Sequence, residues 1–376
     1  MKRILIFIDW FDPAYKAGGP VTAAQNFVDN MSGTYDIYIF TSDRDLGDHE
    51  PLPSITTDKW VERNNVKVFY ASPANLSMSK ITEQVHQVQP DIIYLHSLFS
   101  KAFAIWPMWL HRFGKLKQKM VLAPRGMLRA SALAHKSFKK KVYLFLFKSL
   151  RLQKGLVFHA TDETEYNDVL RHFGNEQAII TAPDFPSSPS PYITYPQKAA
   201  GTVHMIFVGR IHPIKNLDFL LAALQQVQSK VVLTIIATIE DRAYWQKCEA
   251  LMKKLPEHVK IDFKGSMQNK EIKAVLALNH IFVLPTKGEN FGHAIFEALG
   301  AGRPVLISDQ TFWRNLPEKK AGWDVPLQTE KFVEVIEKAA TMQQQELNEW
   351  CNGAWSFCRQ YIERSGIKEQ YIKLFS

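Results

Sequence analysis

The chain has 376 residues, of which 46% are hydrophobic and 22% are charged, a composition typical of a soluble globular protein long enough for two domains. No apolar run approaches the roughly 20 residues of a membrane-spanning helix. The apolar start is interrupted by Asp9 and Asp12, which predicts a buried strand rather than a signal peptide. Three scattered cysteines exclude a disulfide framework or a cysteine zinc site and favour a reducing, cytoplasmic compartment.

The formal net charge of +9 is unevenly distributed along the chain. Fourteen Lys and Arg residues, and no Asp or Glu, lie between Asp91 and Asp162, so the rest of the chain is net acidic. This asymmetry predicts an anionic partner for the N-terminal half.

Short apolar runs alternate with helical patterns in the first half, which predicts a parallel α/β domain over residues 1–185. Strands are expected at 3–9, 36–41, 66–71, 91–96, 120–124, 156–160 and 178–181, with helices between several of them, for example at 21–30, 82–88 and 137–152. A Pro- and Ser-rich run over 182–191 then indicates a linker, which we assign to 186–202.

The alternation restarts in a second expected domain over 203–355. Strands are expected at 203–208, 231–237, 260–263, 281–284 and 305–308, with helices beginning near 216, 242, 269 and 291, and helices alone from 330 onward. Two such domains would create a cleft, where ligands commonly bind.

The segment from Glu289 to Glu297 combines a loop carboxylate with a helix start near Phe291. The free N–H groups of a first helical turn attract anions, whereas carboxylates suit hydroxyl groups. This pattern predicts a ligand with both phosphates and sugar diols. The spacing alone would also fit an amphipathic helix with two solvated Glu residues.

The motif Glu-x7-Glu, followed by Glu-Ala-Leu-x-x-Gly-x-Pro-Val, resembles the nucleotide-sugar site of glycosyltransferase family 4. The resemblance covers most of the chain and includes 207–216, the Gly18-Gly19-Pro20 loop, 122–127 and 159–165. It implies a retaining enzyme of the GT-B architecture, in which two Rossmann-like domains face a central cleft. It also implies that the segment 356–376 crosses back onto the N-terminal domain.

Two cations, Arg210 and Lys215, lie near a helix start and would bind and stabilise a diphosphate leaving group; the alternative is a pair of surface charges. Gly18 and Gly19 could offer backbone N–H groups to phosphate, although a tight turn is the usual reason for such a pair. With this positive charge available, and no metal-ligand pattern in the sequence, we expect a metal-independent enzyme without a cofactor.

The remaining site roles follow from the resemblance. It implies that Glu297 binds the ribose diol, that Glu289 holds a hydroxyl of the transferred sugar, and that the main chain at Asn290, Phe291 and Gly292 completes the donor site. It also places the base contact near Met267, largely through backbone. We expect His96 either to contact the donor sugar as a catalytic residue or to be a buried structural histidine.

Arg125, Arg129 and Lys136 are expected on the acceptor side. The segment 135–154 has seven Lys and Arg and no acid. As a basic amphipathic helix with its aromatic residues on the apolar side, it suits an anionic membrane surface or a buried domain helix with a solvated basic face. Nothing indicates a nucleic-acid-binding module.

These features predict a cytoplasmic glycosyltransferase, peripheral to the inner face of the cell membrane. It would move a sugar from a nucleotide diphosphate sugar, with a UDP-sugar favoured, to a lipid-linked or polysaccharide acceptor of envelope glycans such as lipopolysaccharide, O-antigen, capsule or exopolysaccharide. The alternatives are a nucleotide-sugar epimerase of the same architecture and a non-catalytic glycan-binding relative.

Overall fold

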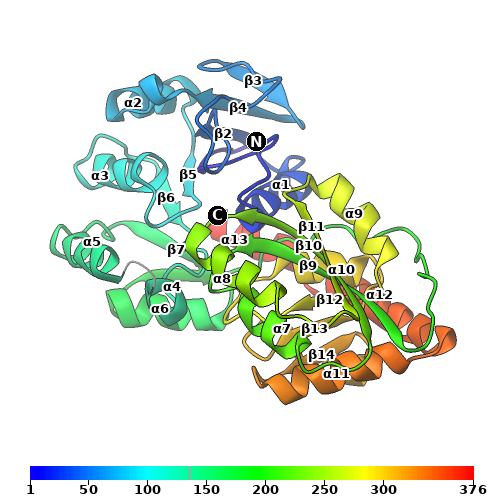
Figure 1. Cartoon of the computed structure of the whole chain (residues 1–376). Coiled ribbons are helices and arrows are strands. Elements are labelled where there is room, and N and C mark those ends of the chain that lie inside the picture. The colour runs from blue at the N-terminus through cyan, green and yellow to red at the C-terminus, as the bar shows by residue number, and fades with distance from the viewer. Residues whose placement is uncertain (135–136) are drawn as a thin grey trace. The chain divides into compact units, whose positions relative to one another are not determined.

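The computed structural model describes residues 1–134 and 137–376, coloured along the chain in Figure 1. The chain forms two compact units: unit 1 comprises Met1–Phe185 with Gly366–Ser376, and unit 2 comprises Pro186–Ser365. The C-terminal residues therefore belong to unit 1. The expected linker residues 186–202 are part of unit 2, and the expected boundary at 355/356 is wrong because it falls inside the continuous helix α12 (Gln344–Arg364).

Unit 1 is an eight-stranded sheet with the order β3-β4-β2-β1-β5-β6-β7-β8. All neighbouring strands are parallel except β3 and β4. The strands are β1 (Arg3–Phe7), β2 (Asp36–Ser42), β3 (Trp60–Arg63), β4 (Val66–Ala71), β5 (Ile92–Leu95), β6 (Lys119–Leu122), β7 (Leu156–Ala160) and β8 (Ala178–Thr181). The helices are α1 (Gly19–Met31), α2 (Met78–Val88), α3 (Trp106–Arg112), α4 (Ala130–Ala134), α5 (Ser137–Ser149), α6 (Glu163–Phe173) and α13 (Ile367–Phe375).

Helices cover both faces of this sheet, which explains why its central strands are apolar throughout. On one face, residues of α2, α3, α5 and α6 share a hydrophobic core with Phe7 and Leu95. On the other, the ring of Phe27 in α1 lies 5.8 Å from that of Tyr94, and Phe375 of α13 lies 5.3 Å from Tyr94. The C-terminal helix thus completes the core of unit 1.

The edge strand β3 was not predicted. It pairs antiparallel with β4 through a turn at Asn64 and Asn65, which have φ values of 49° and 60°. Asn tolerates this left-handed backbone, and two such residues between strands are typical of a type I′ hairpin turn. This Asn-Asn pair was a sequence signal that could have revealed the strand.

Unit 2 is a six-stranded parallel sheet with the order β11-β10-β9-β12-β13-β14. The strands are β9 (Thr202–Ile211), β10 (Lys230–Ile239), β11 (Val259–Gly265), β12 (Ile281–Leu284), β13 (Val305–Ser308) and β14 (Gly322–Val325). The helices are α7 (Leu217–Leu224), α8 (Arg242–Met252), α9 (Asn269–Leu278), α10 (His293–Gly300), α11 (Thr329–Thr341) and α12.

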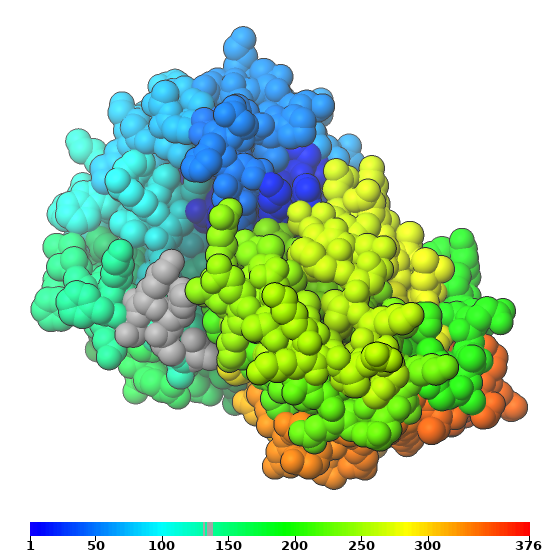
Figure 2. All heavy atoms as spheres, viewed as in Figure 1, coloured from blue at the N-terminus to red at the C-terminus, as the bar shows by residue number. Residues whose placement is uncertain are grey.

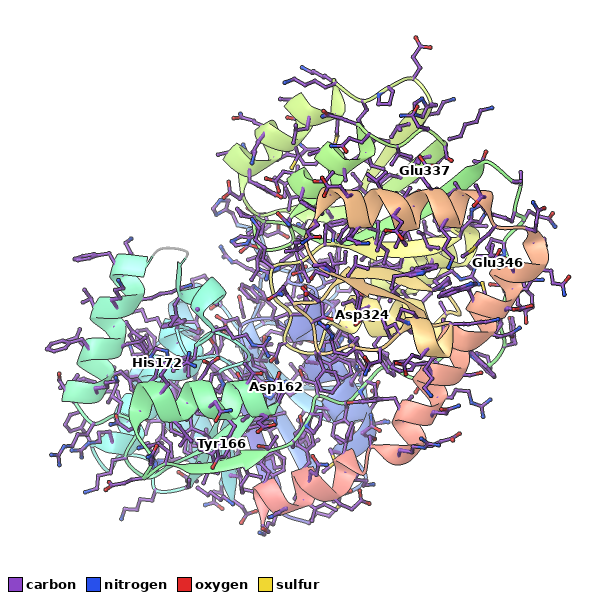
Figure 3. The ribbon with its side chains drawn as sticks, turned by 90° about the horizontal axis from the view of Figure 1, so that it is seen from below. Asp162, Tyr166, His172, Asp324, Glu337 and Glu346 are labelled. Carbon is purple, nitrogen blue, oxygen red and sulfur yellow. The ribbon has the colours of Figure 1, made fainter. Side chains whose placement is uncertain are left out.

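The strand β14 was also missed, because Gly and Asp disfavour strands. Gly322 nonetheless has to be small: a Cβ atom there would overlap the backbone of Val305 in the neighbouring strand. Figure 3 labels Asp324 within β14.

Figure 3 also labels Asp162 at the start of α6 in unit 1. The side chain of Asp162 accepts a hydrogen bond from Glu165 N at 2.7 Å. Within residues 1–134 and 137–376, no helix is both long and apolar enough to cross a bilayer.

Candidate functional site

The carboxyl ends of the central strands of unit 2 gather charged side chains. Arg210 lies near the end of β9, Glu240 directly follows β10, and Glu289 lies five residues beyond the end of β12. Because the strands are parallel, these segments meet at one edge of the sheet, where open α/β folds bind their ligands.

Lys215 and Glu289 form the central pair at this edge. The Lys215 Nζ atom lies 2.5 Å from a carboxylate oxygen of Glu289, and the side chains are only 17% and 10% exposed. Their loops are tied together because the carbonyl of Ile214 accepts hydrogen bonds from Lys287 N at 2.7 Å and Thr286 Oγ1 at 3.1 Å. Two of the predicted donor residues are therefore brought together across 74 positions of sequence.

Arg210 forms a second ion pair at the same edge, with Glu240. The Arg210 Nη1 atom lies 2.7 Å from the Glu240 carboxylate, and both side chains are about one third exposed. Such a solvated pair contributes at most about 1 kcal/mol, so an anionic ligand can replace Glu240 at little cost. Sequence reasoning did not identify Glu240, although its place directly after a strand was a usable signal.

The helix α10 begins at His293, two residues later than expected. Gly292 is its N-cap and has a φ of 78°, a left-handed conformation that Gly adopts without strain. The ring of Phe291 is buried among aromatic side chains, and its carbonyl accepts a hydrogen bond from Trp313 Nε1 at 2.7 Å. The Phe291 side chain therefore belongs to the core, and only its backbone remains a candidate for ligand contact.

Glu297 lies on α10 at the wall of a small pocket. Ser187 Oγ donates a hydrogen bond to its carboxylate at 3.4 Å, and Lys273 of α9 lines the same pocket. Burial raises the pKa of Glu297, and this rise is opposed by the charges of His293 and Lys273 and by the bond from Ser187. Met267, in the loop after β11, is half-buried against the core of unit 2.

The predicted glycine loop lies in unit 1. Gly18 is the N-cap of α1 with a φ of 65°, and Gly19 is the first residue of that helix. The preceding loop is fixed by the buried carboxylate of Asp45, which accepts from Tyr15 N at 2.8 Å and Lys16 N at 3.1 Å. Asp45 thus positions the start of α1 and was not predicted.

Arg125, predicted on the acceptor side, is held by internal partners in unit 1. Its guanidinium is buried and forms an ion pair with buried Asp184, and its Nη2 atom donates to Tyr94 Oη at 3.2 Å. An arginine held in this way supports the core of unit 1, and its role on the acceptor side stays a prediction. Its φ of 56° marks a constrained turn.

His96 lies beside this arginine at the end of β5. Its Nδ1 atom is 3.4 Å from Arg125 Nη2, so Nδ1 is the acceptor and the neutral ring carries its proton on Nε2. Nε2 is buried without a hydrogen-bond partner among the described residues. Desolvation, together with the charges of Arg125 and His159, lowers the pKa of His96 well below its usual value. His96 is therefore a neutral hydrogen-bond donor. This state is compatible both with a contact to the donor sugar and with a structural role.

Arg129 also has an internal partner, since it forms an ion pair with Asp162. Nearby, the buried carboxylate of Glu165 accepts hydrogen bonds from Gly126 N at 2.5 Å and from Thr161 N at 2.8 Å. These contacts hold the loop after β6 against α6. Lys136, the third predicted acceptor residue, lies outside the described residues. In the described part of the chain, no group of three or more His, Cys, Asp or Glu is placed to hold a metal ion.

The arrangement of two parallel-sheet α/β units is the GT-B fold of glycosyltransferases. Sucrose-phosphate synthase from Thermosynechococcus elongatus superposes with a TM-score of 0.74 at 16% identity, covering 100% of this chain and 98% of that one. The Anabaena protein Alr3699/HepE, solved with UDP and glucose, gives 0.73 at 14% identity, covering 100% and 99%. WaaG, a glycosyltransferase involved in lipopolysaccharide biosynthesis, gives 0.65 at 13% identity, covering 100% of both chains.

Comparison of the amino-acid sequence adds a family match and two relatives to this structural similarity. Residues 202–341, within unit 2, match the family model described as glycosyl transferases group 1. It is 32% identical over 104 residues to the sulfoquinovosyl transferase SQD2 of Arabidopsis thaliana, covering 28% of this chain and 19% of that protein. It is 23% identical over 197 residues to the D-rhamnosyltransferase WbpZ of Pseudomonas aeruginosa, covering 49% and 50%. The matched segments thus span half or less of these relatives.

Proposed function

We propose that this protein transfers a sugar, with retention of anomeric configuration, from a nucleoside diphosphate sugar to a glycan acceptor. The observation that carries the proposal is the Lys215–Glu289 pair at the carboxyl edge of the unit 2 sheet, with Arg210 on the same edge. A cation suits a diphosphate, and a carboxylate suits sugar hydroxyls, so the pair supplies both halves of donor recognition.

In the proposed donor complex, both cations exchange partners. Arg210 would leave Glu240, and Lys215 would leave Glu289, to contact the diphosphate. The freed carboxylate of Glu289 would then accept hydrogen bonds from hydroxyls of the transferred sugar, while Glu297 would accept from the ribose. Without a donor, the charges of these side chains neutralise one another in two ion pairs. With a donor bound, Arg210, Lys215 and Glu289 would contact the donor instead.

The proposed reaction is a front-side displacement at the anomeric carbon. The bond from this carbon to the diphosphate oxygen breaks, and the bond to the acceptor oxygen forms on the same face. The acceptor hydroxyl transfers its proton to the leaving diphosphate, whose growing negative charge is stabilised by Arg210 and Lys215. The reaction as proposed uses no metal ion, so turnover should be unchanged when a chelator is added.

A UDP-sugar is the favoured donor because Alr3699/HepE, a structural neighbour, was solved with UDP and with UDP-glucose.

The proposed acceptor is a lipid-linked or polysaccharide intermediate of an envelope glycan. The fold shared with WaaG, a glycosyltransferase involved in lipopolysaccharide biosynthesis, supports this acceptor class. The proposed location is cytoplasmic, consistent with the three cysteines being free and buried.

Ligand-induced thermal stabilisation tests the proposal first. A ligand that binds only the folded protein raises its Tm by mass action, so UDP, GDP, ADP and their sugar conjugates are compared. We expect one nucleotide family to raise the Tm in the wild type and in Arg364→Ala, a surface-charge control, and to raise it much less in Arg210→Ala. Donor turnover without acceptor would favour an epimerase, and no shift with any nucleotide would favour a non-catalytic protein.

A further inference from the structure

The helix α5 has two apolar faces, and only one of them is buried. Leu144 and Phe147 are 7% and 0% exposed and join the core of unit 1. Phe138 and Phe145, in contrast, are 78% and 69% exposed. The expectation that the aromatic residues of this helix share one apolar side is therefore only half right.

The exposed apolar residues form a single stripe. Phe138, Val142, Phe145 and Leu146 follow spacings of four, three and one, and at about 3.6 residues per turn they fall within a sector of about 100° on one side of the helix. All four side chains are exposed. On the same helical projection, Lys139 flanks the stripe on one side, and Lys141 and Lys148 flank it on the other; all three are exposed.

The end of α3 contacts the end of α5 and adds two more exposed apolar side chains. Arg112 Nε donates to the carbonyl of Leu150 at 3.2 Å, and its guanidinium lies 5.8 Å from the ring centre of Phe113. Leu150 and Phe113 are 37% and 53% exposed. In Figure 2 the spheres of this region, coloured cyan to green, form an outer margin of unit 1. We name these residues the α5 surface: Phe113, Phe138, Val142, Phe145, Leu146 and Leu150.

We propose that the α5 surface inserts its apolar stripe into a membrane containing anionic lipids, with the helix lying in the plane of the interface. An exposed apolar stripe bordered on both sides by lysine is the pattern of interfacial helices, in which the lysines meet lipid headgroups while the apolar side chains enter the acyl boundary. The absence of any Asp or Glu between Asp91 and Asp162 leaves nothing in this stretch of sequence to repel an anionic bilayer.

The lysines beside the α5 surface favour a membrane over a second copy of the chain as its partner. A dimer through this surface would bring two lysine-bordered stripes together, and the like charges would repel. An anionic bilayer complements the lysines and covers the apolar side chains in one step. The inference rests on α5 itself and not on the proposed transferase activity.

Vesicle flotation with the full-length protein tests the proposal. Vesicles of phosphatidylcholine with phosphatidylglycerol should carry the wild type with them, whereas pure phosphatidylcholine vesicles should bind at least tenfold less. Added salt should weaken binding because it screens the lysines. The double variant F138S/F145S should lower the partition coefficient at least tenfold, and K139E/K141E/K148E should do the same.

Two matched controls keep this test specific. Leu278→Ser changes a 72% exposed apolar side chain at the end of α9, and K253E/K254E/K260E reverses three exposed charges in unit 2; both should bind vesicles as the wild type does. Circular dichroism and Tm establish that every variant folds. Equal binding of the folded F138S/F145S variant would overturn the proposal, as would a wild-type dimer that this variant dissociates.

Discussion

The Nζ atom of Lys215 lies 2.5 Å from the carboxylate of Glu289, joining the loop after β9 to the loop after β12. Each side chain neutralises the other in a largely buried position. In the proposed donor complex the two side chains separate, so the cost of breaking this pair would be part of the free energy of binding.

Replacing Glu289 by Gln should lower turnover by about two to three orders of magnitude, because interactions made with the reacting sugar act on the transition state. The shape of the side chain is kept, and Lys215 remains able to bind diphosphate. Steady-state kinetics should therefore show a larger fall in kcat than rise in KM. An unchanged kcat in a folded variant would remove Glu289 from the reaction.

Replacing Glu240 by Gln should tighten donor binding about two- to fivefold, because Arg210 no longer has to leave a charged partner worth at most about 1 kcal/mol. Arg210→Ala should instead weaken binding about 10- to 100-fold, the loss expected for a charge-assisted contact to phosphate. Isothermal titration with the nucleotide identified by thermal shift measures both. Weaker binding in Glu240→Gln would contradict the exchange of partners.

Replacing Arg125 by Ala should destabilise the protein by about 3–5 kcal/mol, because it leaves the buried carboxylate of Asp184 without its cation. Urea denaturation measures the loss. The matched control is Arg171→Ala, since Arg171 is 68% exposed in its pair with Asp168 and should contribute less than about 1 kcal/mol. A stable Arg125→Ala variant with altered acceptor preference would instead support the predicted role of Arg125 on the acceptor side.

Replacing Gly292 by Ala should lower stability by about 1–2 kcal/mol, because the left-handed backbone disfavours a Cβ atom. That atom would also lie 3.0 Å from Ile295 Cδ1. Gly33→Ala is the control, since Gly33 lacks a positive φ and a Cβ there would meet nothing within 4 Å. Equal Tm values for the two variants would show that α10 can begin without this conformation.

Acid should destabilise unit 1 through His159. Its Nδ1 atom lies 2.7 Å from Tyr94 Oη and its Nε2 atom 2.7 Å from the carbonyl of Ala182, and burial lowers its pKa to about 3 from the usual 6.5. The unfolded chain therefore binds the proton more tightly, so stability is fully present above pH 6.5 and is lost as the pH falls toward 3.

Urea denaturation at about pH 5 and about pH 7.5, in the range where an unfolded histidine titrates, should show this loss in the wild type. His159→Gln should be less stable at the higher pH but should lose less on acidification. The same pH dependence in both proteins would assign the acid sensitivity to other groups.

The sequence determined the α/β layers and the local chemistry. Buried parallel strands need apolar residues on both faces, so segments such as 281–284 were recognisable from composition alone. The segment from Glu289 to Glu297 also carried its own signal, because a loop carboxylate and a glycine at a helix start are local features. Strands whose composition disfavours strand structure, such as β14, were missed.

Only the tertiary structure decided which charges meet. Arg125 and Arg210 are both arginines that follow or end a strand, yet the first is buried against Asp184 and the second pairs with Glu240 near solvent. Likewise, the sequence of α5 shows the helical period of its apolar residues. Only the structure shows that one apolar face packs into the core of unit 1 and that the other is exposed. The partner of a charged side chain, and the face of a helix that is buried, depend on residues distant in the sequence, which a local pattern does not identify.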